Sequence, residues 1–259
     1  MKNIFIAILL MLLGSSAGYA VSPAILHGVS SGSSSESPSC PSYYASAILS
    51  MNFENGLNAC DSSGNEVLFT GSGAEIGAYG ETGQGLRVND EGEDITKSQA
   101  DQEYVNEHTN QTLCVKVKIS AQLDNAVGII RFRDSGYDDQ ITLAINSASP
   151  AVLIGYYDTD GAGNDYSGTG TGLVVDTWQT VAYSWQGGTV PNGDIWVDPG
   201  DGGGWEESDS VIDVAMTTAI TQIQIGAIWG DPDSADAEYI YIDEWALVGS
   251  YKFDCSTLF

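Results

Sequence analysis

Short hydrophobic runs, separated by turn residues, recur along the chain from about residue 48 to its end. The clearest alternation lies in 113–119, where Leu113, Val115 and Val117 are separated by Cys114 and Lys116. This pattern indicates a strand with one buried and one wet face. No segment has a sustained helical period. The pattern predicts strands at 48–53, 67–69, 85–88, 113–119, 127–132, 140–145, 151–157, 178–185, 194–197 and 220–229.

The stretch 238–251, EYIYIDEWALVGSY, is apolar on both faces and therefore predicts an inner strand of a layered structure. Asp243 and Glu244 interrupt those faces. A carboxylate on an apolar face must be solvated, hydrogen-bonded or matched by a cation, because burying it bare is costly. Strict alternation places Tyr239, Tyr241, Trp245 and Leu247 on one face and Ile240, Ile242, Ala246 and Val248 on the other.

The segments between these strands are rich in Gly, Asp, Asn and Ser, which are turn formers. Loops are predicted at 59–65, 90–109, 158–171 and 200–204. The acidic loop 158–165, DTDGAGND, lacks the glycine and glutamate positions of an EF-hand and is interpreted as a turn. Many short strands with turn signals predict an all-β fold, a two-sheet antiparallel β-sandwich of the jelly-roll type.

The N-terminal region has the features of an export signal. Lys2 precedes an apolar run at 4–13, and small residues at 18–20 form a cleavage signal. The run is too short to anchor the chain in a bilayer. The expected organisation is a signal peptide at 1–20, a Ser-rich flexible linker at 21–39 and one folded domain at 40–259. The protein is therefore expected to be secreted or periplasmic.

Acidic residues dominate the chain after the signal peptide. Seven Lys and Arg remain against 35 Asp and Glu, a formal charge of −28. Nucleic acid and anionic membrane surfaces are poor partners for such a chain, and no membrane insertion is expected. Cations, neutral sugars and basic proteins remain possible partners.

Four cysteines lie outside the signal peptide, which in an exported protein suggests two disulfides with three possible connectivities. If the first and last strands are neighbours, Cys40 and Cys255 lie just beyond their outer ends. That arrangement favours the pairs Cys40–Cys255 and Cys60–Cys114.

Four pieces, in order, resemble the laminin-G-like jelly-roll domain of the concanavalin A-like lectin/glucanase superfamily. They are LSMNFENGLNACDSSGN at 49–65, GETGQGLRV at 80–88, WQTVAYSWQGGTVPNGDIWVD at 178–198, and the strands 223–226 and 239–248. The pieces span nearly the whole domain. One departure is Pro199, where the family commonly has glycine.

The resemblance implies a structural calcium ion near the junction of the first and last strands. Ca²⁺ takes about 6–8 oxygen ligands from carboxylates, carbonyls and water. Two alternatives to an ion remain open: Asp61 caps its own turn, and Asp243 accepts hydrogen bonds from loop amides. The residues that could supply ligands are Glu54, Asp61, Asn65 and Asp243.

Sugar binding requires exposed aromatic rings beside polar side chains. Trp178 and Trp185 flank a predicted strand and are interpreted as packing residues. Tyr166 lies in a loop. The candidates for carbohydrate binding lie on or beside loops and strand ends: Tyr156, Tyr157, Trp196, Trp205 and Trp229.

Catalysis has little support in the sequence. The only histidines, His27 and His108, fall in the linker and in an acidic loop, and no catalytic triad or zinc site can be assembled. The glucanase motif Glu-x-Asp-x-x-Glu is absent. The sequence therefore favours an exported non-catalytic module that binds a glycan or cell-surface polysaccharide, with calcium. Two alternatives are a polysaccharide-degrading enzyme of the same fold, hydrolase or lyase, and a surface or matrix domain that contacts proteins.

Overall fold

The computed structural model describes residues 46–100, 103–106, 109–136, 140–147, 150–158, 167–186, 193–198, 204–207, 219–229 and 238–259. The chain divides into two units, Met1–Glu36 and Ser37–Phe259, and every described residue lies in the second. The expected signal peptide, the linker and Cys40 lie outside the described residues. In the described part of the chain, no helix has the length and hydrophobicity needed to cross a membrane.

The described secondary structure consists of strands and one short 3₁₀ helix near the C-terminus. The elements are β1 (Ala47–Met51), β2 (Asn58–Asp61), β3 (Glu66–Leu68), β4 (Thr70–Ser72), β5 (Glu75–Gly77), β6 (Gly85–Val88), β7 (Glu93–Ser98), β8 (Gln111–Ile119), β9 (Val127–Arg133), β10 (Gln140–Ile145), β11 (Val152–Asp158), β12 (Ser167–Gly172), β13 (Gln179–Trp185), β14 (Gly193–Asp198), β15 (Gly204–Glu207), β16 (Gln222–Trp229), β17 (Ile240–Val248) and η2 (Cys255–Thr257).

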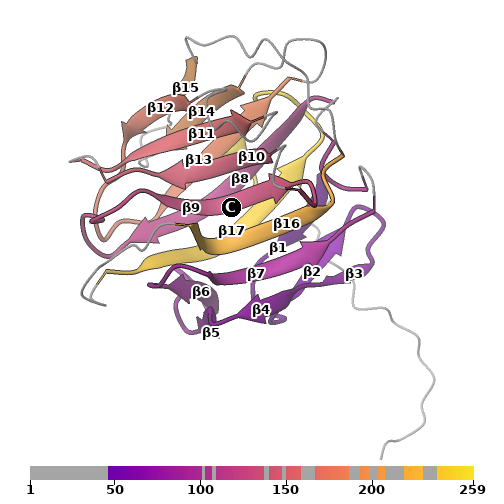
Figure 1. Ribbon diagram of the computed structural model, residues 1–259, viewed down its shortest axis with the longest axis horizontal. Coiled ribbons are helices and arrows are strands. Elements are labelled where there is room, and N and C mark those ends of the chain that lie inside the picture. Colours follow the sequence, from indigo (N-terminus) through magenta and orange to yellow (C-terminus); the bar gives the residue numbers. More distant parts are fainter. Residues whose placement is uncertain are drawn as a thin grey trace, which may run out of the picture. The chain divides into compact units, whose positions relative to one another are not determined.

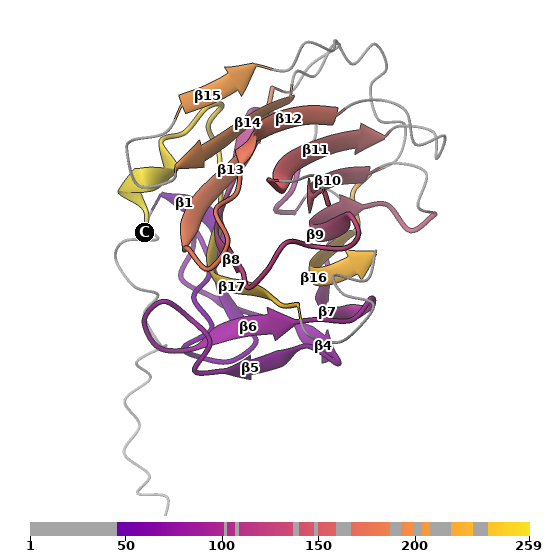
Figure 2. The same cartoon turned by 90° about the vertical axis from the view of Figure 1, so that its left-hand side faces the viewer.

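These strands form two antiparallel sheets, and Figures 1 and 2 show them as two layers. Within the described residues, a 10-stranded sheet has the order β15-β14-β13-β8-β17-β1-β2-β3, with β6 paired to β17 and β5 to β6. The second sheet has seven strands in the order β12-β11-β10-β9-β16-β7-β4. The predicted all-β, two-sheet antiparallel sandwich is confirmed.

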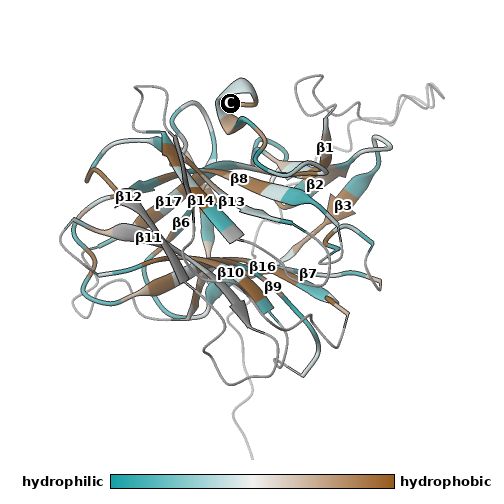
Figure 3. Cartoon of the chain, turned by 90° about the horizontal axis from the view of Figure 1, so that it is seen from above, coloured by the Kyte–Doolittle hydropathy of each residue, from teal (hydrophilic) through white to brown (hydrophobic). Residues whose placement is uncertain are grey.

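Hydrophobic side chains from both sheets fill the space between the layers. Figure 3 shows hydrophobic positions, in brown, along strands of both layers. Phe132 of β9 and Trp185 of β13 come from opposite layers, and their ring centroids lie 5.9 Å apart. Phe69 meets Trp245 of β17 edge-to-face, also at 5.9 Å. Fully buried aromatic pairs of this kind dominate core energetics because each ring removes a large apolar area from water.

The first and last strands lie side by side, as predicted. β1 pairs with β17 in antiparallel register, with Leu49 opposite Leu247 and Met51 opposite Trp245. β17 also pairs with β8 and β6, which makes it an inner strand of the larger sheet. The long hydrophobic run near the C-terminus therefore organises this sheet.

The predicted strict alternation of side chains between the two faces of β17 is wrong. Opposite β8, Ile242 pairs with Val117 and Glu244 with Lys116, so β17 contains one extra residue, a β-bulge at Asp243. A bulge breaks the two-residue period and re-aims a side chain. The core face consequently consists of Ile240, Ile242, Trp245 and Leu247, while Ala246 and Val248 pack in a second cluster.

Three strands fall largely in predicted loops. β2 overlaps 59–65, β7 lies in 90–109 and contains a single large apolar residue, Ile95, and β12 overlaps 158–171 and reads SGTGTG. All three are formed by backbone pairing, β2 with β1 and β3, β7 with β16 and β4, and β12 with β11. A neighbouring strand can supply such pairing to a segment that shows no hydrophobic period of its own.

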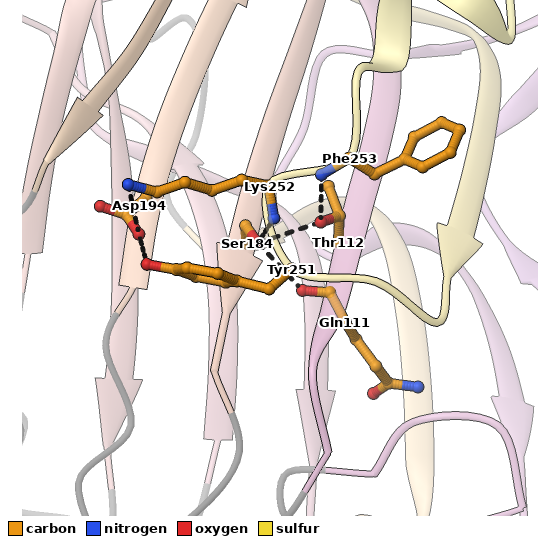
Figure 4. Close-up of polar contacts among 7 residues, drawn as sticks. All are labelled: Gln111, Thr112, Ser184, Asp194, Tyr251, Lys252 and Phe253. Carbon is orange, nitrogen blue, oxygen red and sulfur yellow. Dashed lines mark hydrogen bonds and ion pairs between the residues drawn. The ribbon is translucent and has the colours of Figure 1, made fainter.

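The C-terminal tail (249–259) turns back across the outer face of the larger sheet (Figure 4). Thr112 Oγ1 donates to the Ser250 carbonyl at 2.6 Å, and the Lys252 N–H donates to Ser184 Oγ at 2.8 Å. Tyr251 donates to the carboxylate of Asp194. The reversal requires a positive φ of 51° at Lys252. These contacts place η2 on the sheet.

The tail determines the disulfide connectivity. Cys255 is bonded to Cys114 of β8, and both sulfur-bearing residues are buried in a cluster with Ala182, Trp196 and Ala246. The predicted pairs Cys40–Cys255 and Cys60–Cys114 are therefore wrong. The prediction assumed that the chain leaves the sheet beyond β17, whereas it folds back onto β8. Cys60 is disulfide-bonded as well, while Cys40 lies outside the described residues.

We expect the Cys114→Ser/Cys255→Ser double variant to lose about 3–5 kcal/mol of unfolding free energy, because the bond closes a long loop. Urea denaturation of both proteins measures the loss. Non-reducing peptide mapping of the wild type should recover one fragment joining Cys114 to Cys255. A fragment joining Cys60 to Cys114 would contradict this connectivity.

Candidate functional site

A cluster of carboxylates surrounds loop 80–84, where this loop meets β1 and β17. Asp243 is buried, with 2% of its surface exposed, and its Oδ2 accepts from the Glu81 N–H at 2.9 Å. Glu54, just after β1, accepts from the Gln84 N–H at 2.7 Å through Oε1. We call Glu54, Glu81, Asp243 and Glu244 the carboxylate junction. Two of its members thus hold the loop from both sides.

Glycines allow the loop to approach these carboxylates. A Cβ on Gly80 would lie closer than 3.0 Å to both Asp243 Oδ1 and the Gln84 carbonyl oxygen. Gly83 has a φ of +87°, and a Cβ there would collide with Glu54 Oε1. Only glycine fits in these two positions. The space beside Gly80 is therefore lined by two oxygen atoms, one from a carboxylate and one from the backbone.

Burial raises the pKa of Asp243, although hydrogen bonds from the loop amides and the charge of Lys116 oppose the rise. Burial likewise raises the pKa of Glu244, and the neighbouring charge of Asp243 adds to the effect. Lys116 of β8 forms an ion pair with Glu81. One cation thus faces a group of four carboxylates, so this part of the molecule retains negative charge at neutral pH.

Asp61 and Asn65, the other two predicted ligands, bond to each other at the β2–β3 turn. Asp61 Oδ1 accepts from the N–H groups of Ser63 and Asn65, each at 2.8 Å, and its Oδ2 accepts from the Asn65 side chain at 3.0 Å. Slight burial raises the pKa of Asp61, but these hydrogen bonds outweigh it and leave the pKa below its usual value. The pair closes its own turn.

By their hydrogen bonds, the four predicted ion ligands form two separate pairs. Glu54 and Asp243 share loop 80–84, whereas Asp61 and Asn65 contact each other. Among the described residues, no group of three or more His, Cys, Asp or Glu side chains is arranged around a common metal position. Calcium remains a prediction, and the fit of these residues to it depends on backbone oxygens.

The predicted sugar-binding aromatics lie on both sheets. Trp196 is only 4% exposed and packs in the cluster beneath the C-terminal tail, so it does not present a ring to solvent. Trp205 of the edge strand β15 pairs with it in register. Tyr156 and Tyr157 belong to β11, and Trp229 ends β16. The side-chain environments of these other four lie outside what the structure describes.

A row of aromatic rings, which the sequence pattern did not predict, lies on the outer face of the larger sheet. Tyr241 lies 6.5 Å from Trp178, 6.2 Å from Tyr79 and 6.1 Å from Tyr239, measured between ring centroids. All four rings are half-buried. We call these four residues the ring row. The sequence pattern predicts Trp178 as a packing residue, and strict alternation places Tyr239 and Tyr241 with the core residues Trp245 and Leu247; the structure contradicts both.

Two of the chain's few basic side chains lie against the ring row. The Arg87 guanidinium lies 4.5 Å from the Tyr79 ring centroid, and Lys118 Nζ lies 4.6 Å from that of Tyr241. Arg87 and Lys118 are the register partners of Tyr241 on β6 and β8. Arg87 also forms an ion pair with Glu75. A signal for this surface existed in the sequence, since tyrosines alternate with isoleucines before Asp243.

Neither a protein-family model nor a curated protein sequence matches the chain. Solved structures are similar in fold. The binding domain of botulinum neurotoxin serotype G has a TM-score of 0.60 and 15% identity, covering 82% of this chain and 49% of that one. The binding domain of Paraclostridial Mosquitocidal Protein 1 has a TM-score of 0.60 and 12% identity, covering 83% and 51%.

A third similar structure is Trypanosoma rangeli sialidase in complex with a difluoro derivative of a nononic acid. It has a TM-score of 0.57 and 15% identity, and the match covers 82% of this chain and 32% of the sialidase. The chain thus spans about half the length of the toxin domains and a third of the enzyme. At these identities the likeness concerns the fold alone, a two-sheet β-sandwich.

The raised pKa values of Asp243 and Glu244 predict a pH dependence of stability in calcium-free buffer. A carboxyl whose pKa is higher in the folded state contributes stability at low pH and loses it as the pH rises through the folded pKa. The melting temperature, followed by circular dichroism with chelator, should therefore fall between about pH 4 and pH 7.

Asp243→Asn should flatten this profile, because the amide oxygen still accepts from the loop but cannot ionise. Asp61 has the opposite sign, since a lowered pKa contributes stability above the unfolded value and loses it as the pH falls. Asp61→Asn is thus the matched control and should lower stability at neutral pH. An Asp243→Asn profile as steep as the wild type would refute the assignment.

Proposed function

We propose that this protein is an exported, non-catalytic, laminin-G-like carbohydrate-binding module, and that the ring row is its glycan-binding surface. The observation that supports this most directly is the continuity of the four rings across the outer sheet face. Aromatic faces stack on the apolar faces of sugar rings, and adjacent polar groups bond the hydroxyls. Arg87, Lys118 and Glu75 supply such groups here.

The neighbours named as toxin binding domains and a sialidase–ligand complex accord with a binding role for this fold. The bonded cysteines accord with an oxidising compartment, so a secreted or periplasmic location fits the proposal. Hydrolase or lyase activity and protein-only binding are alternatives that the experiments below distinguish.

Calcium would bind beside Gly80 and support the ring row. Asp243 Oδ1 and the Gln84 carbonyl line that space, Glu54 lies at the other side of the loop, and further backbone oxygens and water would complete the 6–8 ligands of Ca²⁺. The ion would offset the charge of the carboxylate junction. Because Tyr79 directly precedes Gly80, a fixed loop also fixes this ring against Tyr241.

A calcium ion at this position predicts that chelator lowers the melting temperature of the wild type. At a free concentration of about 100 times its Kd, a ligand stabilises the folded state by about 2.7 kcal/mol, which corresponds to about 5–10 °C for a domain of this size. Differential scanning calorimetry across a calcium titration measures the shift.

Asp243→Asn should abolish the calcium-dependent part of the melting temperature, whereas Asp61→Asn should keep it. The sign of the Asp243→Asn effect also depends on the ion. The variant should be less stable than the wild type with calcium and at least as stable with chelator, because it removes a buried charge. Stability indifferent to calcium in the wild type would end the ion hypothesis.

A glycan array is expected to find a ligand for the wild type, with the affinity reduced about three- to tenfold by Trp178→Ala or Tyr241→Ala, since stacking on each ring contributes about 0.5–1.5 kcal/mol. Leu68→Ala, which truncates a residue 62% exposed on β3, is the matched control and should bind normally. Reducing-sugar release and absorbance of unsaturated products, measured with the same glycans, test the enzyme alternative. If Trp178→Ala and Tyr241→Ala bind glycans like the wild type, the ring row is not the glycan-binding surface.

A further inference from the structure

Glu244 lies beside the ring row on the outer face of the larger sheet. β17 and β8 are neighbours in this sheet (Figure 2), and Tyr241 of the ring row is the register partner of Lys118. The next outward-facing pair along the same two strands is Glu244 and Lys116. Because of the bulge at Asp243, Glu244 follows Tyr241 on this face. The carboxylate junction and the ring row are therefore adjacent.

The alternation along β8 confirms that these side chains share one face. Val115 and Val117, which flank Lys116, belong to the core, so Lys116 and its register partner point outward. Residues two apart on one strand, such as Lys116 and Lys118, lie about 7 Å from each other. This separation is comparable to the size of one sugar unit. A sugar stacked on Tyr241 can therefore reach the neighbouring row with its hydroxyls.

Lys118 brings a hydrogen-bond donor against two rings of the ring row. Its Nζ lies 4.6 Å from the ring centroid of Tyr241 and 5.2 Å from that of Trp178. Within the described residues, no carboxylate forms an ion pair with this ammonium. An ammonium has three N–H donors, and contact with aromatic faces does not use them as hydrogen bonds to oxygen would. Lys118 can therefore donate to a sugar oxygen beside Tyr241.

Glu244 brings the matching acceptor. Its side chain is half-buried, so the carboxylate has lost part of its contact with water. Its register partner Lys116 forms an ion pair with Glu81 instead. In the described part of the chain, the Glu244 carboxylate has neither a hydrogen-bond donor nor an ion-pair partner. A carboxylate in this condition accepts strongly from a ligand hydroxyl, because a hydrogen bond to a charged group is stronger than a neutral one.

The combination of a free acceptor and a free donor restricts the ligand. Two hydroxyls on adjacent carbons of a sugar can donate to the one and accept from the other, so a single sugar unit satisfies Glu244 and Lys118 together. A carboxylate or sulfate in place of the first hydroxyl has no proton to donate. It would also face Glu244 with like charge, which costs affinity. The position therefore favours an uncharged sugar.

We propose that Glu244 determines the specificity of this surface, because it accepts from a hydroxyl of a neutral sugar unit stacked on Tyr241 while Lys118 donates to an adjacent oxygen of the same unit. This inference rests on the proposed glycan binding by the ring row and adds the class of ligand. The ligand is an uncharged saccharide with two free hydroxyls on adjacent carbons, and uronic or sulfated sugars are rejected.

The test is isothermal titration calorimetry of the purified protein with tetrasaccharides of glucose, mannose and galactose, each beside the tetrasaccharide of its uronic acid. At least one neutral tetrasaccharide should bind, at least tenfold more tightly than its uronic counterpart. Glu244→Gln should weaken the neutral ligand about tenfold, because a hydrogen bond to a charged group is lost. Glu66→Gln, which removes an exposed carboxylate from β3 of the same sheet, is the matched control and should bind normally.

Two further measurements separate recognition from structure. Glu244→Gln should narrow the preference for the neutral over the uronic tetrasaccharide, a ratio that a merely structural role would not move. Its melting temperature with chelator should equal or exceed that of the wild type, because the variant removes a half-buried charge. The weaker binding should be the same with calcium and with chelator. A loss that occurs only with calcium would assign Glu244 to the ion and overturn the proposal.

The outcomes for this inference and for the proposed function are distinct. If Trp178→Ala weakens binding while Glu244→Gln binds normally, the glycan surface stands and the role of Glu244 is overturned. Equal or tighter binding of the uronic tetrasaccharides, or no binding of any of the six, overturns the inference as well. Only the glycan array and the ring variants decide whether the ring row binds glycans at all.

Discussion

The buried carboxylate of Asp243 is the constraint on which the rest of this structure depends. A charged group on an inner strand needs donors, and the amides of loop 80–84 supply them. The bulge that turns Asp243 toward this loop also changes the phase of β17. Asp243 therefore joins loop 80–84 to β17. The bulge at Asp243 also leaves Tyr239 and Tyr241 on the outer face and places Trp245 in the core.

The two sheets consequently present different surfaces. The larger one exposes the ring row at β17 and is covered elsewhere by the C-terminal tail, whose disulfide and hydrogen bonds fix it on β8 and β13. In the smaller sheet, the side chains of Arg131 and Arg133 both donate to Gln224 Oε1. Each surface thus combines aromatic or polar side chains from several neighbouring strands.

The sequence predicted the strands with a strong hydrophobic period and the contact between the chain ends, because burial imposes that period directly. It did not reveal β7 or β12, which form through backbone pairing with neighbours. It grouped Asp61 and Asn65 with Glu54 and Asp243 by residue type, although a local turn satisfies the first pair. It overlooked Trp178, Tyr239 and Tyr241, since a bulge leaves no mark in composition.

The sequence by itself thus determined the fold class, the central position of its last strand and the need to satisfy Asp243, all of which follow from the cost of exposing apolar groups or burying charged ones. Only the tertiary structure decided the partner of Cys255, the face of each ring beside Asp243 and the meeting of Arg131 and Arg133 at Gln224. Those outcomes depend on register and on the direction in which the chain turns, and a one-residue shift reverses the face that every side chain occupies.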